Sequence, residues 1–135
     1  MPSLGNSNPT RRRTTARPWV VAAALALVAT GCATSRAFTQ GERAAKAGDW
    51  DVAVSYFARA VEGSPNRPDY RIRLEQARLA ASRAHLEAAR GYEAQDQLDF
   101  AVREYRKVID YDGANQEARA RIEILEQTIR DRIEA

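Results

Sequence analysis

Apolar residues recur at helical spacing in two segments of the chain, 48–66 and 96–115. In the first segment they fall at positions i, i+3, i+4, i+7 and i+8, and in the second at i, i+4, i+7 and i+8, which gives each helix one apolar stripe. The two segments also align with each other at a distance of 48 residues, so that Ala53 matches Ala101 and Phe57 matches Tyr105. Because a single helix cannot bury such a stripe, the pattern predicts an all-α fold built from a duplicated helical hairpin.

A third apolar stripe predicts one long helix over about 69–95. No proline follows Pro68 in this stretch, and Asp69 occupies the expected N-cap position. The stripe consists of Tyr70, Leu74, Ala77, Ala81, Ala84, Ala88 and Tyr92, and it is broadened by Leu79, Leu86 and Ala89. The first half of this helix is expected to project beyond a regular two-helix unit, so that it either needs a partner surface or tolerates exposure of mostly alanine.

A capping helix is predicted over about 116–135. Its apolar face consists of Ala118, Ile122, Leu125, Ile129 and Ile133. Arginine and glutamate cover the opposite face, as expected of a helix that closes the apolar end of a repeat array. No glycine or proline stop signal precedes Ala135, so continuation of the helix in a longer gene product is an alternative.

The first third of the chain has the composition of an export signal. Residues 1–18 contain four arginines and no acidic residue, and an uncharged apolar run follows over 19–29. This run matches the apolar core of a signal peptide and is shorter than the ~20 residues that span a bilayer. We therefore expect a signal peptide over 1–31 and a mature domain over 32–135.

The sequence Ala-Thr-Gly-Cys at 29–32 resembles the lipobox of bacterial lipoproteins, although Ala29 replaces the usual leucine. The resemblance implies cleavage before Cys32 and a lipid anchor on its side chain. Because Ala33 is not aspartate, it also implies sorting to the outer membrane, facing the periplasm. An ordinary signal peptide with an incidental cysteine, or an uncleaved membrane anchor, is the alternative.

The mature domain is close to electrically neutral. Four of the 21 basic residues precede Cys32, which leaves 17 against 18 acidic residues, a net charge of −1. Nucleic-acid binding requires a basic surface on the folded domain, so a nucleic-acid partner is not expected.

Within this domain the residues resemble a tetratricopeptide repeat. The first repeat, about 34–67, and the second, about 82–115, match the family's small, aromatic and turn positions through Gly41, Ala53, Phe57, Ala60, Pro65, Ala89, Tyr92, Ala101 and Tyr105. The chain departs from the pattern where Ala44 replaces a tyrosine, and its 48-residue spacing exceeds the 34-residue period of the family. The alternative is a generic pair of helical hairpins.

This resemblance implies a scaffold for protein–protein interaction, whose inner helices line a shallow groove. The groove candidates are Phe38 and Glu42 in the first repeat and Leu86, Arg90 and Glu93 in the second. The run 80–135 also resembles segments that precede the channel domains of outer-membrane secretins. The alternative function is therefore the docking part of a secretion or pilus assembly protein.

No arrangement of side chains in the sequence predicts an enzyme, and we expect no metal, cofactor or small-molecule substrate. His85 is the only histidine and is expected on the surface, without a nucleophile or base partner. The acidic residues Asp96, Asp99, Asp110 and Asp112 lack the spacing of a calcium loop. Asp51 and Asp99 suit helix N-termini, where the helix dipole favours an acidic side chain.

Overall fold

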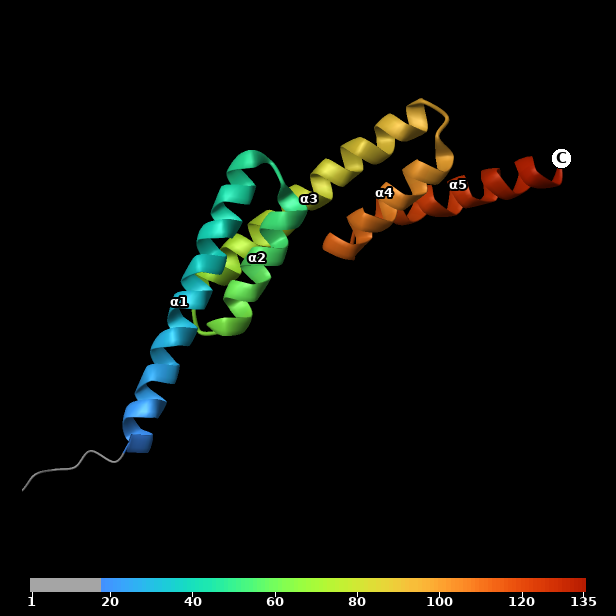
Figure 1. Cartoon of the computed structure of the whole chain (residues 1–135). Helices are drawn as coiled ribbons and strands as arrows, with labels where there is room; N and C mark the ends of the chain where they lie inside the picture. The colour runs from blue at the N-terminus through green and yellow to red at the C-terminus, as the bar shows by residue number, and fades with distance from the viewer. Residues whose placement is uncertain (1–17) are drawn as a thin grey trace, which may run out of the picture.

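The computed structural model describes the backbone from Pro18 and the side chains from Ala33 onward. This part of the chain is all-α, as predicted, with five helices and no strand (Figure 1). The helices are α1 (Pro18–Ala47), α2 (Trp50–Gly63), α3 (Pro68–Ala94), α4 (Leu98–Tyr111) and α5 (Gln116–Glu134).

The helices form two three-helix units that share α3 (Figure 1). The first unit consists of α1, α2 and the first half of α3, and the second consists of the second half of α3, α4 and α5. Each unit has its own buried core. The first core contains Ala44, Ala53, Phe57, Leu74 and Ala77. The second contains Ala89, Leu98, Ala101, Val102, Tyr105, Val108, Ala118 and Leu125.

The 48-residue duplication seen in the sequence extends to the helix boundaries. Helices α2 and α4 each have 14 residues, and both ends of α4 lie 48 residues after those of α2. The turns that precede them also correspond, because Gly48 (φ 81°) and Asp96 (φ 58°) both adopt the left-handed conformation. In both turns the backbone N–H of the following residue donates a hydrogen bond to a carbonyl oxygen of the preceding helix, from Asp49 to Ala44 at 3.0 Å and from Gln97 to Tyr92 at 2.9 Å. The structure thus repeats a whole helix–turn–helix unit.

Most residues that match the tetratricopeptide pattern are buried. The four alanines Ala53, Ala60, Ala89 and Ala101 are fully buried, and Phe57 and Tyr105 nearly so. Gly41 lies against Phe57, where an added methyl group would stand 2.7 Å from the ring. Tyr92 is half-buried and Pro65 is exposed in the turn between α2 and α3. These small residues let neighbouring helices approach closely.

The long helix was predicted to within one residue at each end, but its N-cap was not. Arg67 occupies the N-cap and Pro68 the first helical position, where the fixed φ of proline suits a helix start. The side chain of Asp69 makes an ion pair with Arg67 at 2.7 Å instead of capping the helix. The prediction of Asp69 as the N-cap was therefore wrong.

Each half of α3 packs on a different unit, so its first half has a partner surface, one of the two expected alternatives. Leu74 and Ala77 pack into the first core, and Ala89 into the second. Between them the buried face shifts, because Ser82 is buried while Ala84 and Leu79 are exposed. A helix with two partners on different sides cannot keep one continuous buried stripe, so the predicted burial of Ala84 and Leu79 was wrong.

The two terminal helices differ from expectation at their outer ends. Helix α1 begins at Pro18, well before the predicted start of the first repeat at about residue 34, because the alanine- and leucine-rich run favours helix and contains no proline. Ile133 in α5 is 79% exposed, although it was predicted to belong to the apolar face. Among the helices with described side chains, none is both long and apolar enough to cross a membrane.

Candidate functional site

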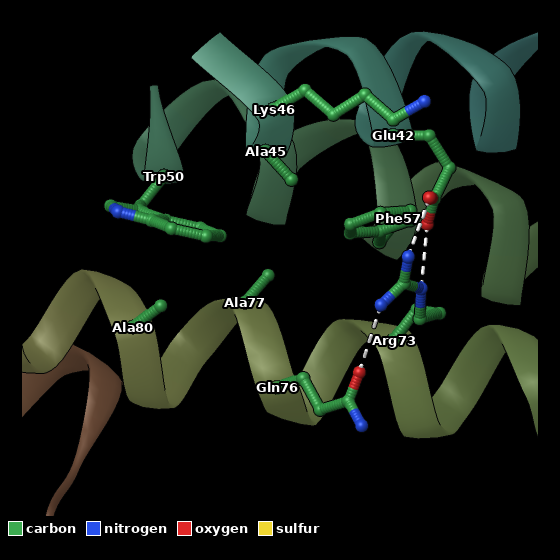
Figure 2. Close-up of a pocket in the computed structure, with 9 residues that line it drawn as sticks. All are labelled: Glu42, Ala45, Lys46, Trp50, Phe57, Arg73, Gln76, Ala77 and Ala80. Atoms are coloured by element: carbon green, nitrogen blue, oxygen red, sulfur yellow. Dashed lines mark hydrogen bonds and ion pairs between the residues drawn. The ribbon is translucent and has the colours of Figure 1, made fainter. Parts of the chain in front are cut away.

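A groove of about 310 Å³ lies between α1 and α3, with α2 behind it (Figure 2). We call it the first groove. Three alanines and two aromatic rings make its walls largely apolar, and Figure 2 shows the indole of Trp50 at one end and the ring of Phe57 towards the other. The lining residues are Glu42, Ala45 and Lys46 from α1, Trp50 and Phe57 from α2, and Arg73, Gln76, Ala77 and Ala80 from α3.

An ion pair joins α1 and α3 at the Phe57 end of the first groove. Arg73 donates from Nε and Nη2 to the two carboxylate oxygens of Glu42, at 2.6 and 2.5 Å (Figure 2). It also donates from Nη1 to Gln76 at 3.1 Å. The hydrogen bonds to Glu42 raise the pKa of Arg73, so the guanidinium stays charged. The pair bridges the two helices that flank the groove.

A second groove, of about 350 Å³, lies between α3 and α5. Its lining residues are Arg90, Glu93, Ala94, Tyr105, Glu117 and Arg121. All of them except Glu117 stand 48 residues after a residue of the first groove. The duplication has therefore produced two grooves at corresponding places in the two units.

The two grooves differ in chemistry. In the second groove Arg90 pairs with Glu117 at 2.6 Å, and Glu93 pairs with Arg121 and accepts a hydrogen bond from the Tyr105 hydroxyl at 2.9 Å. Its charged groups thus satisfy one another within the protein. The first groove instead has alanine surface at its centre and the indole of Trp50 at one end, which a partner can cover with apolar side chains.

The five predicted partner-binding residues fall into two groups. Glu42 lines the first groove, and Arg90 and Glu93 line the second. Phe38 is half-buried and stacks on Tyr70, with ring centroids 4.5 Å apart. Leu86 is also half-buried and packs against the second core. Phe38 and Leu86 therefore contribute to packing more than to a groove.

The sequence analysis did not identify Trp50 and Arg73 as groove residues. Both lie outside the repeat pattern from which the candidates were chosen. An isolated tryptophan at the start of a helix was the available signal, since tryptophan is common in binding sites. Cys32, the predicted lipidation site, lies outside the residues whose side chains the structure describes.

His85 lies at the junction of the two units, and the prediction that it is a surface residue was wrong. Only 13% of its side chain is exposed. Its Nδ1 lies 2.6 Å from Glu104 on α4, and its Nε2 lies 2.8 Å from Asp51 on α2. The Tyr111 hydroxyl donates to the same oxygen of Asp51 at 2.8 Å, and the Tyr111 ring stacks on His85. We call these four residues the His85 junction.

The charge state of the His85 junction follows from its hydrogen bonds. A carboxylate can only accept, so both bonds to His85 form when both ring nitrogens carry a proton. Burial raises the pKa of Asp51 and of Glu104, but hydrogen bonds from His85, assisted by Tyr111 and Lys107, outweigh burial and leave both pKa values lowered. Burial and the bond to Asp51 raise the pKa of Tyr111 to about 12. The junction thus places the His85 ring between two carboxylates, each within hydrogen-bonding distance of one ring nitrogen.

Metal-binding clusters are absent among the residues with described side chains. In that part of the chain, no group of three or more histidine, cysteine, aspartate or glutamate side chains is arranged to hold a metal ion. The acidic residue Asp96 instead pairs with Arg132 at 2.9 Å.

Comparison of the chain with known proteins gave no family assignment. No family model matches the sequence, and no curated protein matches it significantly.

Proposed function

We propose that this chain is a lipid-anchored scaffold of the bacterial cell envelope, which binds a segment of another envelope protein in its first groove. The single observation that carries the proposal is the apolar, solvent-open groove between α1 and α3. The lipobox-like sequence at Cys32 and the tetratricopeptide-like register support it by resemblance. Outer-membrane sorting and a periplasm-facing domain are part of the same proposal, as is a binding role in place of catalysis.

The surroundings of Trp50 indicate what kind of segment fits. A further hollow of about 300 Å³ lies on the other side of Trp50 and includes Asp49, Asp51 and His85 in its lining. Trp50 therefore stands between a hollow with Lys46 and a hollow with Asp49. The charged groups of Arg73 and Asp51 are paired within the protein, with Glu42 and His85. Opposite charges at the two ends favour a segment of fixed polarity, because like charges placed together repel.

The length of that segment follows from α3. Lining residues on α3 run from Arg73 to His85, which corresponds to ~18 Å at the helical rise of ~1.5 Å per residue. An extended peptide of about six residues covers this distance. We propose a segment with an apolar residue over Trp50, an acidic residue near Lys46 and a basic residue near Asp49.

Selection from a displayed peptide library on the purified protein tests this partner chemistry. Selected peptides should carry acidic, apolar and basic residues in that order, and calorimetry should show binding that Trp50→Ala and Lys46→Glu each weaken at least five-fold. Ile72→Ala is the matched control, since Ile72 is 56% exposed on α3 and lines neither hollow. If both groove variants bind the peptides as tightly as the original chain, the first groove is not the binding site.

The anchor has its own test. Cys32→Ala should abolish metabolic labelling with an alkyne fatty acid and release the protein from the membrane fraction. Labelling or membrane association that does not change in this variant would contradict anchoring through Cys32.

A further inference from the structure

A cleft of about 440 Å³ lies between α1 and α2, apart from both grooves and from the His85 junction. We call it the α1–α2 cleft. Alanine and glycine line part of it, and two arginines and a tyrosine stand around these small residues. The lining residues are Ala33, Thr34, Arg36, Ala37 and Gln40 from α1, and Tyr56, Arg59 and Gly63 from α2.

The two arginines of the cleft bring positive charge that the described part of the chain does not neutralise. Arg36 and Arg59 are both exposed, and neither forms an ion pair with a carboxylate among residues 33–135. Arg59 lies over the ring of Tyr56, 5.5 Å from its centroid. In the grooves, by contrast, Arg73 and Arg90 each pair with a glutamate. The cleft is therefore suited to an anion.

The position of the cleft relates it to Cys32. Thr34 is buried against the end of α2, where Ser64 donates to its hydroxyl at 3.4 Å and Gly63 lies against its methyl group. Figure 1 shows the connection between α2 and α3 beside α1 at this level. The cleft begins at Ala33, the residue after Cys32. A lipid on Cys32 therefore brings the membrane surface to the mouth of the cleft.

We propose that the α1–α2 cleft binds the headgroup phosphate of an anionic phospholipid in the anchoring membrane. This proposal rests on the proposed function, because the lipid anchor is what places the cleft at the membrane surface. Guanidinium groups bind phosphate oxygens through paired N–H donors, which matches Arg36 and Arg59. Tyrosine favours the membrane–water interface, and the alanine walls can contact the glycerol carbons of the lipid.

Titration with short-chain lipids tests the site. Protein purified in a non-ionic detergent is titrated with dihexanoyl phosphatidylglycerol, dihexanoyl phosphatidylcholine and inorganic phosphate, and binding is measured by calorimetry. We expect phosphatidylglycerol to bind at least ten-fold more tightly than the other two. The double variant Arg36→Gln/Arg59→Gln should weaken it roughly 30-fold, since each arginine at an anionic surface contributes about a five-fold gain. Arg83→Gln, on an exposed part of α3, is the control and should change nothing.

Three outcomes would overturn the proposal: equal binding of the two lipids, unchanged binding by the double variant, or inorganic phosphate binding as tightly as phosphatidylglycerol. Circular dichroism of the double variant checks that both units remain folded. The Cys32→Ala variant separates the two proposals. It should bind phosphatidylglycerol like the original chain, whereas its membrane fractionation reports on the anchor alone.

Discussion

The His85 junction should couple the unfolding of the two units, and His85→Phe tests this. Phenylalanine keeps a ring stacked on Tyr111 but removes both bonds to the carboxylates. A hydrogen bond to a charged group contributes about 1.5–3 kcal/mol when buried. The Glu104 side chain is 17% exposed and that of Asp51 is 51% exposed, so we assign the low end of that range to Glu104 and about 0.5 kcal/mol to Asp51. The expected loss of unfolding free energy is about 2 kcal/mol.

Urea denaturation at pH ~6, followed by circular dichroism, measures this loss. Because His85 connects α2 to α4 across α3, its removal should also broaden the transition and lower the denaturant slope. Tyr111→Phe is a matched variant that removes only the hydrogen bond from the hydroxyl to Asp51. It should lower the free energy of unfolding by less than about 1 kcal/mol. A loss below about 0.5 kcal/mol for His85→Phe, with an unchanged slope, would refute the coupling. So would full additivity of His85→Phe with Glu104→Gln, since residues in direct contact give non-additive changes.

Four further predictions concern stability, each measured by urea denaturation. Gly91→Ala should raise the unfolding free energy by about 1 kcal/mol, because Gly91 is helical with open space around it. Gly48→Ala should lower it by about 1 kcal/mol, because Gly48 has φ 81°; a gain there would contradict the left-handed turn. Phe57→Ala should cost about 3–5 kcal/mol, since the ring is 2% exposed, and a loss below 1 kcal/mol would contradict its place in the first core. Because Asp51 and Glu104 have lowered pKa values in the folded protein, stability should fall as both carboxylates protonate below pH ~4; a denaturation midpoint unchanged at pH ~3 would contradict this.

The helices could be predicted from the sequence because the residues that determine each helix lie close together in the chain. The spacing of Ala53, Phe57 and Ala60 determines one face of α2, and the same spacing recurs in α4. The long helix α3 was also predicted, since no proline interrupts it after Pro68. These patterns depend on residues three or four positions apart, so they can be recognised in the sequence alone.

The partners of those helices were harder to predict. The alanine stripe on α3 does not determine which helix packs against it, so the exposure of Ala84 was not predicted. The contacts of His85 join residues 34 and 19 positions away, for which no local pattern exists. The first groove was predicted only in part, because Trp50 and Arg73 line it from two different helices. Such long-range proximity is a property of the tertiary fold.

The shared helix α3 also determines how the two grooves can be used together. The lining residues of the first groove on α3 centre near Ala77, and those of the second near Glu93. Sixteen helical residues correspond to a separation of ~24 Å and a net rotation of nearly half a turn. A straight peptide therefore cannot occupy both grooves, and a two-site ligand needs a linker that bends around α3. Without such a linker a ligand engages one groove at a time, and in the proposed scaffold avidity comes from several copies of the chain.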